Sequence, residues 1–195
     1  MDDLGEAIIC HRQALALRPQ GHPEHLQCLI NLAYAVYTRF EQMRAMEDLE
    51  EAITYNRQAL ALRPQGHPDR SDSLDSLAGA MFTRFQQLGR MEDLEEVITY
   101  FHQALALRPQ GHPNCLNSLN GLAAAFSTRF QHLGGMENLE EAITYFHQAL
   151  ALLPQGHPNR SIFLNNFANA VSTRFQHFGV MEDLLRPSQS FKFSL

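Results

Sequence analysis

The amino-acid sequence predicts an all-α chain built from repeated helical hairpins, and three observations support this. The ten residues ALALRPQGHP occur at 14–23, 59–68 and 104–113, and ALALLPQGHP ends the series at 149–158. Apolar residues recur at helical spacing inside each copy, and no segment alternates with the period of two that a strand requires. Gly and Pro stand between the helical runs and mark the turns. We therefore expect about eight helices stacked in a row as a solenoid.

The repeat has a constant period of 45 residues. Four blocks, 1–45, 46–90, 91–135 and 136–180, align without insertion or deletion, and the second and third are identical at 31 of 45 positions. Such self-similarity predicts one supersecondary unit per block, each packed on its neighbours only. We expect a single repeat array over 1–184, followed at 185–195 by a divergent tail that we predict to be disordered.

The first helix of the unit is clearest in the third block, over 91–108. One face of this helix collects the apolar residues Leu94, Val97, Ile98, Phe101 and Leu105. Asp93 and Glu96 have the spacing of an N-cap and its capping-box acid. Pro109 ends the helix, and Arg108 suits the negative end of its dipole. We call helices of this kind B helices.

The second helix of the unit, about 20 residues long, ends at Leu88. Its apolar face contains Leu74, Leu77, Ala78, Met81, Phe85 and Leu88. Gly89 follows this helix, and we expect it to be a left-handed C-cap. We call helices of this kind A helices. The link PQGHP joins each B helix to the next A helix: Pro64 stops one helix, Gly66 takes a positive φ, His67 sits at the cap of the next helix, and Pro68 occupies its first turn.

These residues resemble the tetratricopeptide repeat (TPR) in its small, aromatic and proline positions, namely Leu77-Ala78 of the second block and Val97, Phe101, Ala104-Leu105 and Pro109 of the third. The unit is longer than the 34-residue form of that repeat. The phrases TRF, GRMEDLEE and ALALRPQGHP are more similar to fungal aromatic di-alanine and TPR-containing arrays, which often precede a CHAT peptidase domain. The resemblance implies a right-handed α-α superhelix whose A helices line a concave groove.

Composition excludes several classes of function. The net charge of −6 and the pI near 5.9 give no electrostatic reason to bind nucleic acid or anionic membranes. The sequence contains neither a signal peptide nor a run of 18 apolar residues, so we expect the cytoplasm, with the nucleus as the alternative. The three cysteines do not recur at the repeat period and are expected to be reduced.

Two ladders of side chains recur every 45 residues, and both have structural explanations. Adjacent copies of the first, His22, His67, His112 and His157, lie two helix layers apart and cannot share a metal ion, so we expect them to cap helices. His25 and Cys28 together would supply a metal ion with only two ligands. The second ladder is Arg39, Arg84, Arg129 and Arg174, expected to form salt bridges with B-helix acids such as Glu95 or Glu96, with a phosphate or acidic-peptide clamp as the alternative. We predict no enzyme, metal or cofactor.

Function is expected where the copies differ on a face that packing does not use. Opposite the apolar face of the A helices lie the candidate groove residues Asn31, Tyr34, Tyr37, Asp72, Asp75, Asn117, Asn120, Asn165, Asn166 and Asn169. Asn both donates to and accepts from a peptide bond, so these residues predict a scaffold that binds a peptide or protein. Solvated polar residues without a ligand are the alternative.

Three further interpretations concern the ends of the sequence. The chain opens with a B helix, and a fifth B helix that starts at Met181 breaks off at Pro187. Uncapped ends of a solenoid can self-associate. They also suit the sensor arm of a larger CHAT-peptidase or NLR-like protein, or a truncated remnant without a partner.

Overall fold

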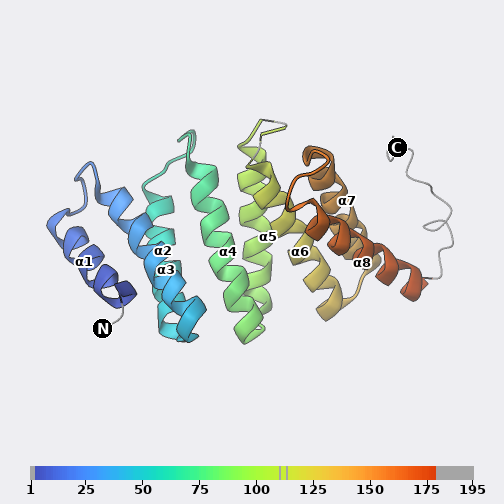
Figure 1. The fold of residues 1–195 in the computed structure, drawn as a ribbon, viewed down its shortest axis with the longest axis horizontal. Coiled ribbons are helices and arrows are strands. Elements are labelled where there is room, and N and C mark those ends of the chain that lie inside the picture. The colour runs from blue at the N-terminus through green and yellow to red at the C-terminus, as the bar shows by residue number, and fades with distance from the viewer. Residues whose placement is uncertain (1–2, 110, 113, 179–195) are drawn as a thin grey trace. The chain divides into compact units, whose positions relative to one another are not determined.

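The computed structural model describes residues 3–109, 111–112 and 114–178, and this part of the chain contains helices and no strands (Figure 1). The all-α prediction and the number of helices are confirmed. The helices are α1 (Asp3–Leu17), α2 (His25–Met43), α3 (Met46–Ala61), α4 (Arg70–Leu88), α5 (Met91–Ala106), α6 (Cys115–Leu133), α7 (Met136–Leu152) and α8 (Arg160–Phe178).

The chain divides into two compact units. The first, Met1–His112, holds α1 to α5, and the second, Pro113–Leu195, holds α6 to α8. Within each unit, every helix packs on the next one along the chain. The boundaries expected for the array, 1–184, stay a prediction, and the tail at 185–195 lies outside the described residues.

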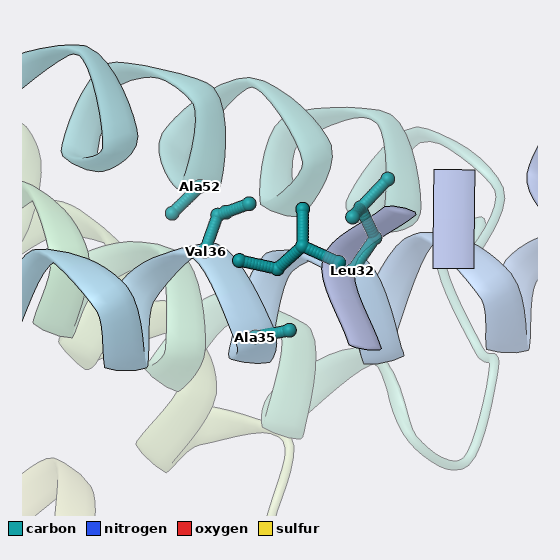
Figure 2. Close-up of a cluster of buried hydrophobic side chains, with 5 residues drawn as sticks. Leu32, Ala35, Val36 and Ala52 are labelled. Carbon is teal, nitrogen blue, oxygen red and sulfur yellow. The ribbon is translucent and has the colours of Figure 1, made fainter. Parts of the chain in front are cut away.

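The two kinds of helix alternate as the 45-residue period predicts. The A helices α2, α4, α6 and α8 have 19 residues each, and the B helices α3 and α5 have 16. Leu77 and Leu94 are completely buried. Figure 2 shows the packing in the first unit, where Leu32 and Val36 of α2 meet Ala52 of α3. Burial of these apolar faces supplies the main driving force for folding.

A short turn joins each A helix to the B helix that follows. Gly89 ends α4 in the left-handed conformation, with φ +66°, and its N–H donates to the carbonyl of Phe85. This confirms the predicted C-cap. Arg44 takes the same position after α2 with φ +58°, a conformation that costs a non-glycine residue energy. Its guanidinium lies over the Phe40 ring, 5.6 Å from the centroid.

The link from B helix to A helix differs in detail from the prediction. Gly66 has φ +87°, as expected. His67 Nδ1 accepts a hydrogen bond from the N–H of Asp69 at 3.1 Å, and the carbonyl of His67 accepts one from the N–H of Arg70. The helix begins at Arg70, so Pro68 lies in a turn before it. His67 therefore closes this turn, because its ring and carbonyl satisfy two N–H groups there.

The histidine ring makes the same contact at other links. His22 Nδ1 accepts from the N–H of Glu24 at 3.1 Å, and His157 Nδ1 accepts from the N–H of Asn159 at 3.2 Å. Since Nδ1 is the acceptor, the ring must carry its proton on Nε2. These histidines therefore close the turn before the A helix and do not cap the helix itself, since the N-cap residue of α4 is Asp69 and it has no side-chain cap.

We expect the substitution His67→Ala to lower the free energy of unfolding by about 1 kcal/mol, because it removes one N–H acceptor at the link. Urea unfolding followed by circular dichroism measures this loss. Gln65→Ala in the same link is the control, since Gln65 is exposed and should change stability by less than about 0.5 kcal/mol. Equal effects of the two substitutions would contradict the role of the His67 ring in this turn.

The predicted N-cap of the B helices is wrong. Helix α5 starts at Met91, and Arg90 occupies the N-cap position without a side-chain cap. Asp93 is buried in the first turn, where it binds an arginine of α4 instead. Glu96, the expected capping-box acid, is exposed and faces Arg57 of α3 at 3.6 Å.

Candidate functional site

Arg84 holds three helices of the first unit together. Its Nε donates to Asp93 Oδ2 at 2.9 Å and its Nη2 to Asp93 Oδ1, while Nη1 donates to Glu50 Oε2 at 2.8 Å. Asp93 belongs to α5 and Glu50 to α3. Arg84 is only 8% exposed. The hydrogen bonds that Arg84 donates to Asp93 raise the pKa of Arg84, although burial alone would lower it. The structure thus confirms a salt bridge to B-helix acids but corrects the partners, which are Asp93 and Glu50 rather than Glu95 or Glu96.

Other members of the arginine ladder make comparable contacts. Arg39 Nε donates to Asp48 Oδ2 at 2.8 Å, and Arg174 Nη1 donates to Glu140 Oε2 at 2.8 Å. In the fourth block Asn138 takes the place of the aspartate, and its amide donates to the Gly134 carbonyl at 2.7 Å. Because Arg39, Arg84 and Arg174 all hold acids of the chain itself, they serve the fold, and the clamp alternative loses its support.

A second buried arginine explains two of the candidate groove residues. Arg108, whose side chain is 3% exposed, approaches Asp72 Oδ1 and Asp75 Oδ2 at 2.7 Å each. Asp75 is itself largely buried. Both aspartates lie in α4 and neutralise a cation at the end of α5, so they have a structural role in the first unit.

The repeat contained a signal for this cluster that the sequence prediction missed. In the copy where Asn117 and Asn120 stand at the positions of Asp72 and Asp75, Leu153 stands at the position of Arg108. In that copy the cation and its acids are absent together, whereas the first copy keeps the cation as Arg63 and has Gln27 and Ile30 in place of the acids.

The first residue of several A helices caps the preceding B helix, a role that the sequence prediction missed. Arg70 Nη1 donates to the carbonyls of Leu60 and Arg63 at the end of α3. Arg160 Nη1 donates to those of Leu150 and Leu153 at the end of α7. A cation there also complements the helix dipole. His25 Nδ1 contacts the Arg18 carbonyl at 2.6 Å, so this ring caps α1.

The outer face of the A helices carries the remaining candidate residues. Each unit has its own such face, which we call its A-helix face: α2 and α4 form it in the first unit, and α6 and α8 form it in the second. Neighbouring A helices lie side by side within each unit, since Tyr37 Oη meets Thr83 Oγ1 at 2.9 Å and the rings of Phe130 and His177 lie 5.5 Å apart. The exposed candidates are Asn31, Tyr34, Asp72, Asn117, Asn165 and Asn169, and those half-buried are Tyr37, Asp75, Asn120 and Asn166.

The two tyrosines of α2 differ in their surroundings. Tyr34 is 74% exposed and offers a free aromatic surface. Tyr37 packs against the core cluster of Ile8, Leu32 and Val36. Its hydroxyl is held by Thr83, so Tyr37 belongs to the packing between α2 and α4.

The outer face of the B helices is a ladder of charge pairs. Arg12 of α1 donates to Glu51 of α3 at 2.7 Å, and Tyr55 donates to the same carboxylate at 2.8 Å. In the second unit, the pKa of Tyr145 is raised to about 12. Burial of the side chain is the larger cause, and the nearby charge of Glu141 is the next. These half-exposed pairs contribute little stability each.

The described residues contain no group of three His, Cys, Asp or Glu side chains that could hold a metal ion. Cys10, Cys28 and Cys115 form no disulfide in the described part of the chain, and Cys28 accepts a hydrogen bond from Arg18 at 3.3 Å. Within the same part of the chain, no helix is both long and apolar enough to cross a membrane.

Alternating 19-residue A helices and shorter B helices, with a constant 45-residue period, define a TPR-like helical-repeat protein. Solved structures agree. A Podosopora anserina protein with nearly identical TPR-like repeats is 23% identical, with a TM-score of 0.67 over 93% of this chain and 84% of that one. BtubC from P. vanneervenii is 16% identical, with a TM-score of 0.66 over 93% of this chain and 68% of that one. No protein-family profile and no curated protein matches the sequence.

Proposed function

We propose that the chain is a protein-interaction scaffold that binds an extended peptide on the A-helix face. A TPR-like repeat fold is consistent with an interaction scaffold. The observation that carries the finer proposal is the row of exposed amides in the second unit, Asn117 on α6 and Asn165 and Asn169 on α8. Their side chains take no part in the hydrogen bonds of the described residues.

The chemistry of these amides suits a peptide backbone. Each offers one carbonyl acceptor and two N–H donors, the complement of a peptide bond. Neither α6 nor α8 contains a carboxylate, and Arg160 and Arg174 are held by the fold. A ligand would therefore be recognised through neutral hydrogen bonds, and its binding should depend only weakly on salt.

In the first unit, Asn31 and Tyr34 of α2 support the same proposal. Gln27 donates to Asn31 Oδ1 at 2.8 Å, which orients that amide, and Tyr34 supplies the apolar surface that recurs in protein interfaces. The proposed site does not include Asp72, Asp75 or Tyr37. The two aspartates pair with Arg108, and the Tyr37 hydroxyl is hydrogen-bonded to Thr83.

To test this proposal, peptides that bind the full chain are selected from a random library, and their affinity for it is measured by fluorescence anisotropy. The variant Asn117→Ala/Asn165→Ala/Asn169→Ala should bind a selected peptide at least about tenfold more weakly, because up to three hydrogen bonds of about 1 kcal/mol are lost. Raising the salt concentration should leave the affinity nearly unchanged.

The matched control is Gln58→Ala/Gln103→Ala/Gln148→Ala, which alters three exposed amides at one repeat position of the B helices. This control should retain the affinity of the wild type. If the asparagine variant binds every selected peptide as tightly as the control, the site does not lie on the A-helix face.

A further inference from the structure

Arg63, just after α3, is a buried cation with incomplete pairing. Its side chain is 11% exposed, and its Nη1 donates to the Asp69 carbonyl at 2.9 Å and to Ser73 Oγ at 2.7 Å. Nε is buried without a hydrogen-bond partner. Nη2 lies 3.7 Å from Oδ2 of Asp69, too far for a hydrogen bond, and the Asp69 side chain is 56% exposed. Because a buried charge is costly unless it is closely paired, Arg63 can still gain from a further anion.

The next copy of the repeat shows what this cation binds when its acids are present. Arg108 takes the same repeat position, and it lies 2.7 Å from carboxylate oxygens of Asp72 and Asp75. The first copy has the neutral residues Gln27 and Ile30 in place of these acids. It therefore keeps the cation of this cluster but lacks the two carboxylates that neutralise it.

The exposed side chains of α2 continue from this cation along the A-helix face of the first unit. Gln27 Nε2 donates to Asn31 Oδ1 at 2.8 Å, one turn further along α2, and no hydrogen bond joins Gln27 to Arg63. Tyr34 follows one turn beyond Asn31, and all three of these α2 side chains are exposed. The row from Gln27 to Tyr34 is about 10 Å long, which is about the length of three residues of extended peptide.

We infer that Arg63 binds a carboxylate of the peptide ligand, in the place that Asp72 takes at Arg108. This carboxylate belongs to an acidic side chain or to the C-terminus of the peptide, and it accepts charge-assisted hydrogen bonds from the guanidinium. It should stand about three residues from an apolar side chain that packs on Tyr34. The choice of a peptide rests on the proposed function. Since the guanidinium is largely buried, salt should screen this pair only weakly.

Titration with sodium acetate tests the cation without any peptide. The arginine Nε–H signals of the full chain are followed by proton–nitrogen NMR, and the Arg63 signal is assigned by its loss in Arg63→Leu. Leu153 is buried at this repeat position in the fourth block, and thermal unfolding checks that the variant folds. Acetate should shift the Arg63 signal to saturation, whereas the Arg108 signal should stay in place. An unmoved Arg63 signal, or an equal shift with sodium chloride, overturns the inference.

A second variant supplies the carboxylate from the chain itself. Gln27→Asp places it at the repeat position of Asp72, so acetate should no longer shift the Arg63 signal. Gln27→Ala is the matched control, because it removes the same amide without adding a charge, and it should respond to acetate like the wild type. Equal responses of Gln27→Asp and Gln27→Ala contradict the inference.

The selected peptides then connect this cation to the proposed function. Some should bind Arg63→Leu at least about tenfold more weakly, and these should carry the predicted carboxylate. Amidation of the C-terminus, or replacement of the acidic residue by its amide, shows which carboxylate is bound. Arg57→Leu, at an exposed arginine of α3, is the control and should keep the affinity. If peptides depend on the asparagines of the second unit and none depends on Arg63, the proposed function stands and this inference falls.

Discussion

Replacing Arg84 by alanine should lower the free energy of unfolding by about 3–5 kcal/mol, among the largest effects expected for a polar residue of this chain. The reason is the burial of Asp93. Without the guanidinium, that carboxylate is left in a nearly water-free position without its bidentate partner. Glu50 is half-exposed and can return to water, so it adds less. Urea unfolding followed by circular dichroism measures the loss.

Two controls separate the buried charge from a general effect of losing an arginine. Arg57→Ala removes an exposed partner of Glu96 and should cost at most about 1 kcal/mol. The double variant Arg84→Met/Asp93→Leu removes both buried charges and should recover most of the stability lost in Arg84→Ala. If Arg84→Ala costs no more than Arg57→Ala, Arg84 does not stabilise the fold in the way the geometry indicates.

Leu94→Ala should lower the free energy of unfolding by about 2–5 kcal/mol, because Leu94 is completely buried in α5 and its truncation leaves a cavity. The repeat offers a matched comparison in Leu4→Ala on α1. Leu4 has the same repeat position but is only half-buried, so we expect a loss of about 1 kcal/mol.

Denaturant unfolding of both leucine variants measures this difference. The comparison holds the residue type and the helix position constant and changes only the burial. Equal losses in the two variants would show that α1 is as fully packed as α5.

Some residues of the candidate site could be predicted from the local sequence pattern, and the role of others depends on tertiary packing. Tyr34, Asn117, Asn165 and Asn169 were predicted from their position on the outer side of a helical wheel, and they are exposed. Asp72 and Asp75 satisfied the same pattern and yet serve Arg108. Periodicity shows which side of a helix a residue occupies, but it does not show which distant residue comes to lie beside it.

The sequence by itself determined the helices, their order and their turns. The 45-residue repetition identifies the repeating unit directly. The apolar spacing defines the helices, and Gly89 and Pro64 define where helices end, because these signals depend only on residues close together in the chain. The tertiary structure alone decided the partners of the charged residues. Arg84 lies 9 residues from Asp93 and 34 from Glu50, and Arg108 lies 36 from Asp72. Several acids could have served each arginine, and only the packing of one helix on another brings a particular carboxylate within reach.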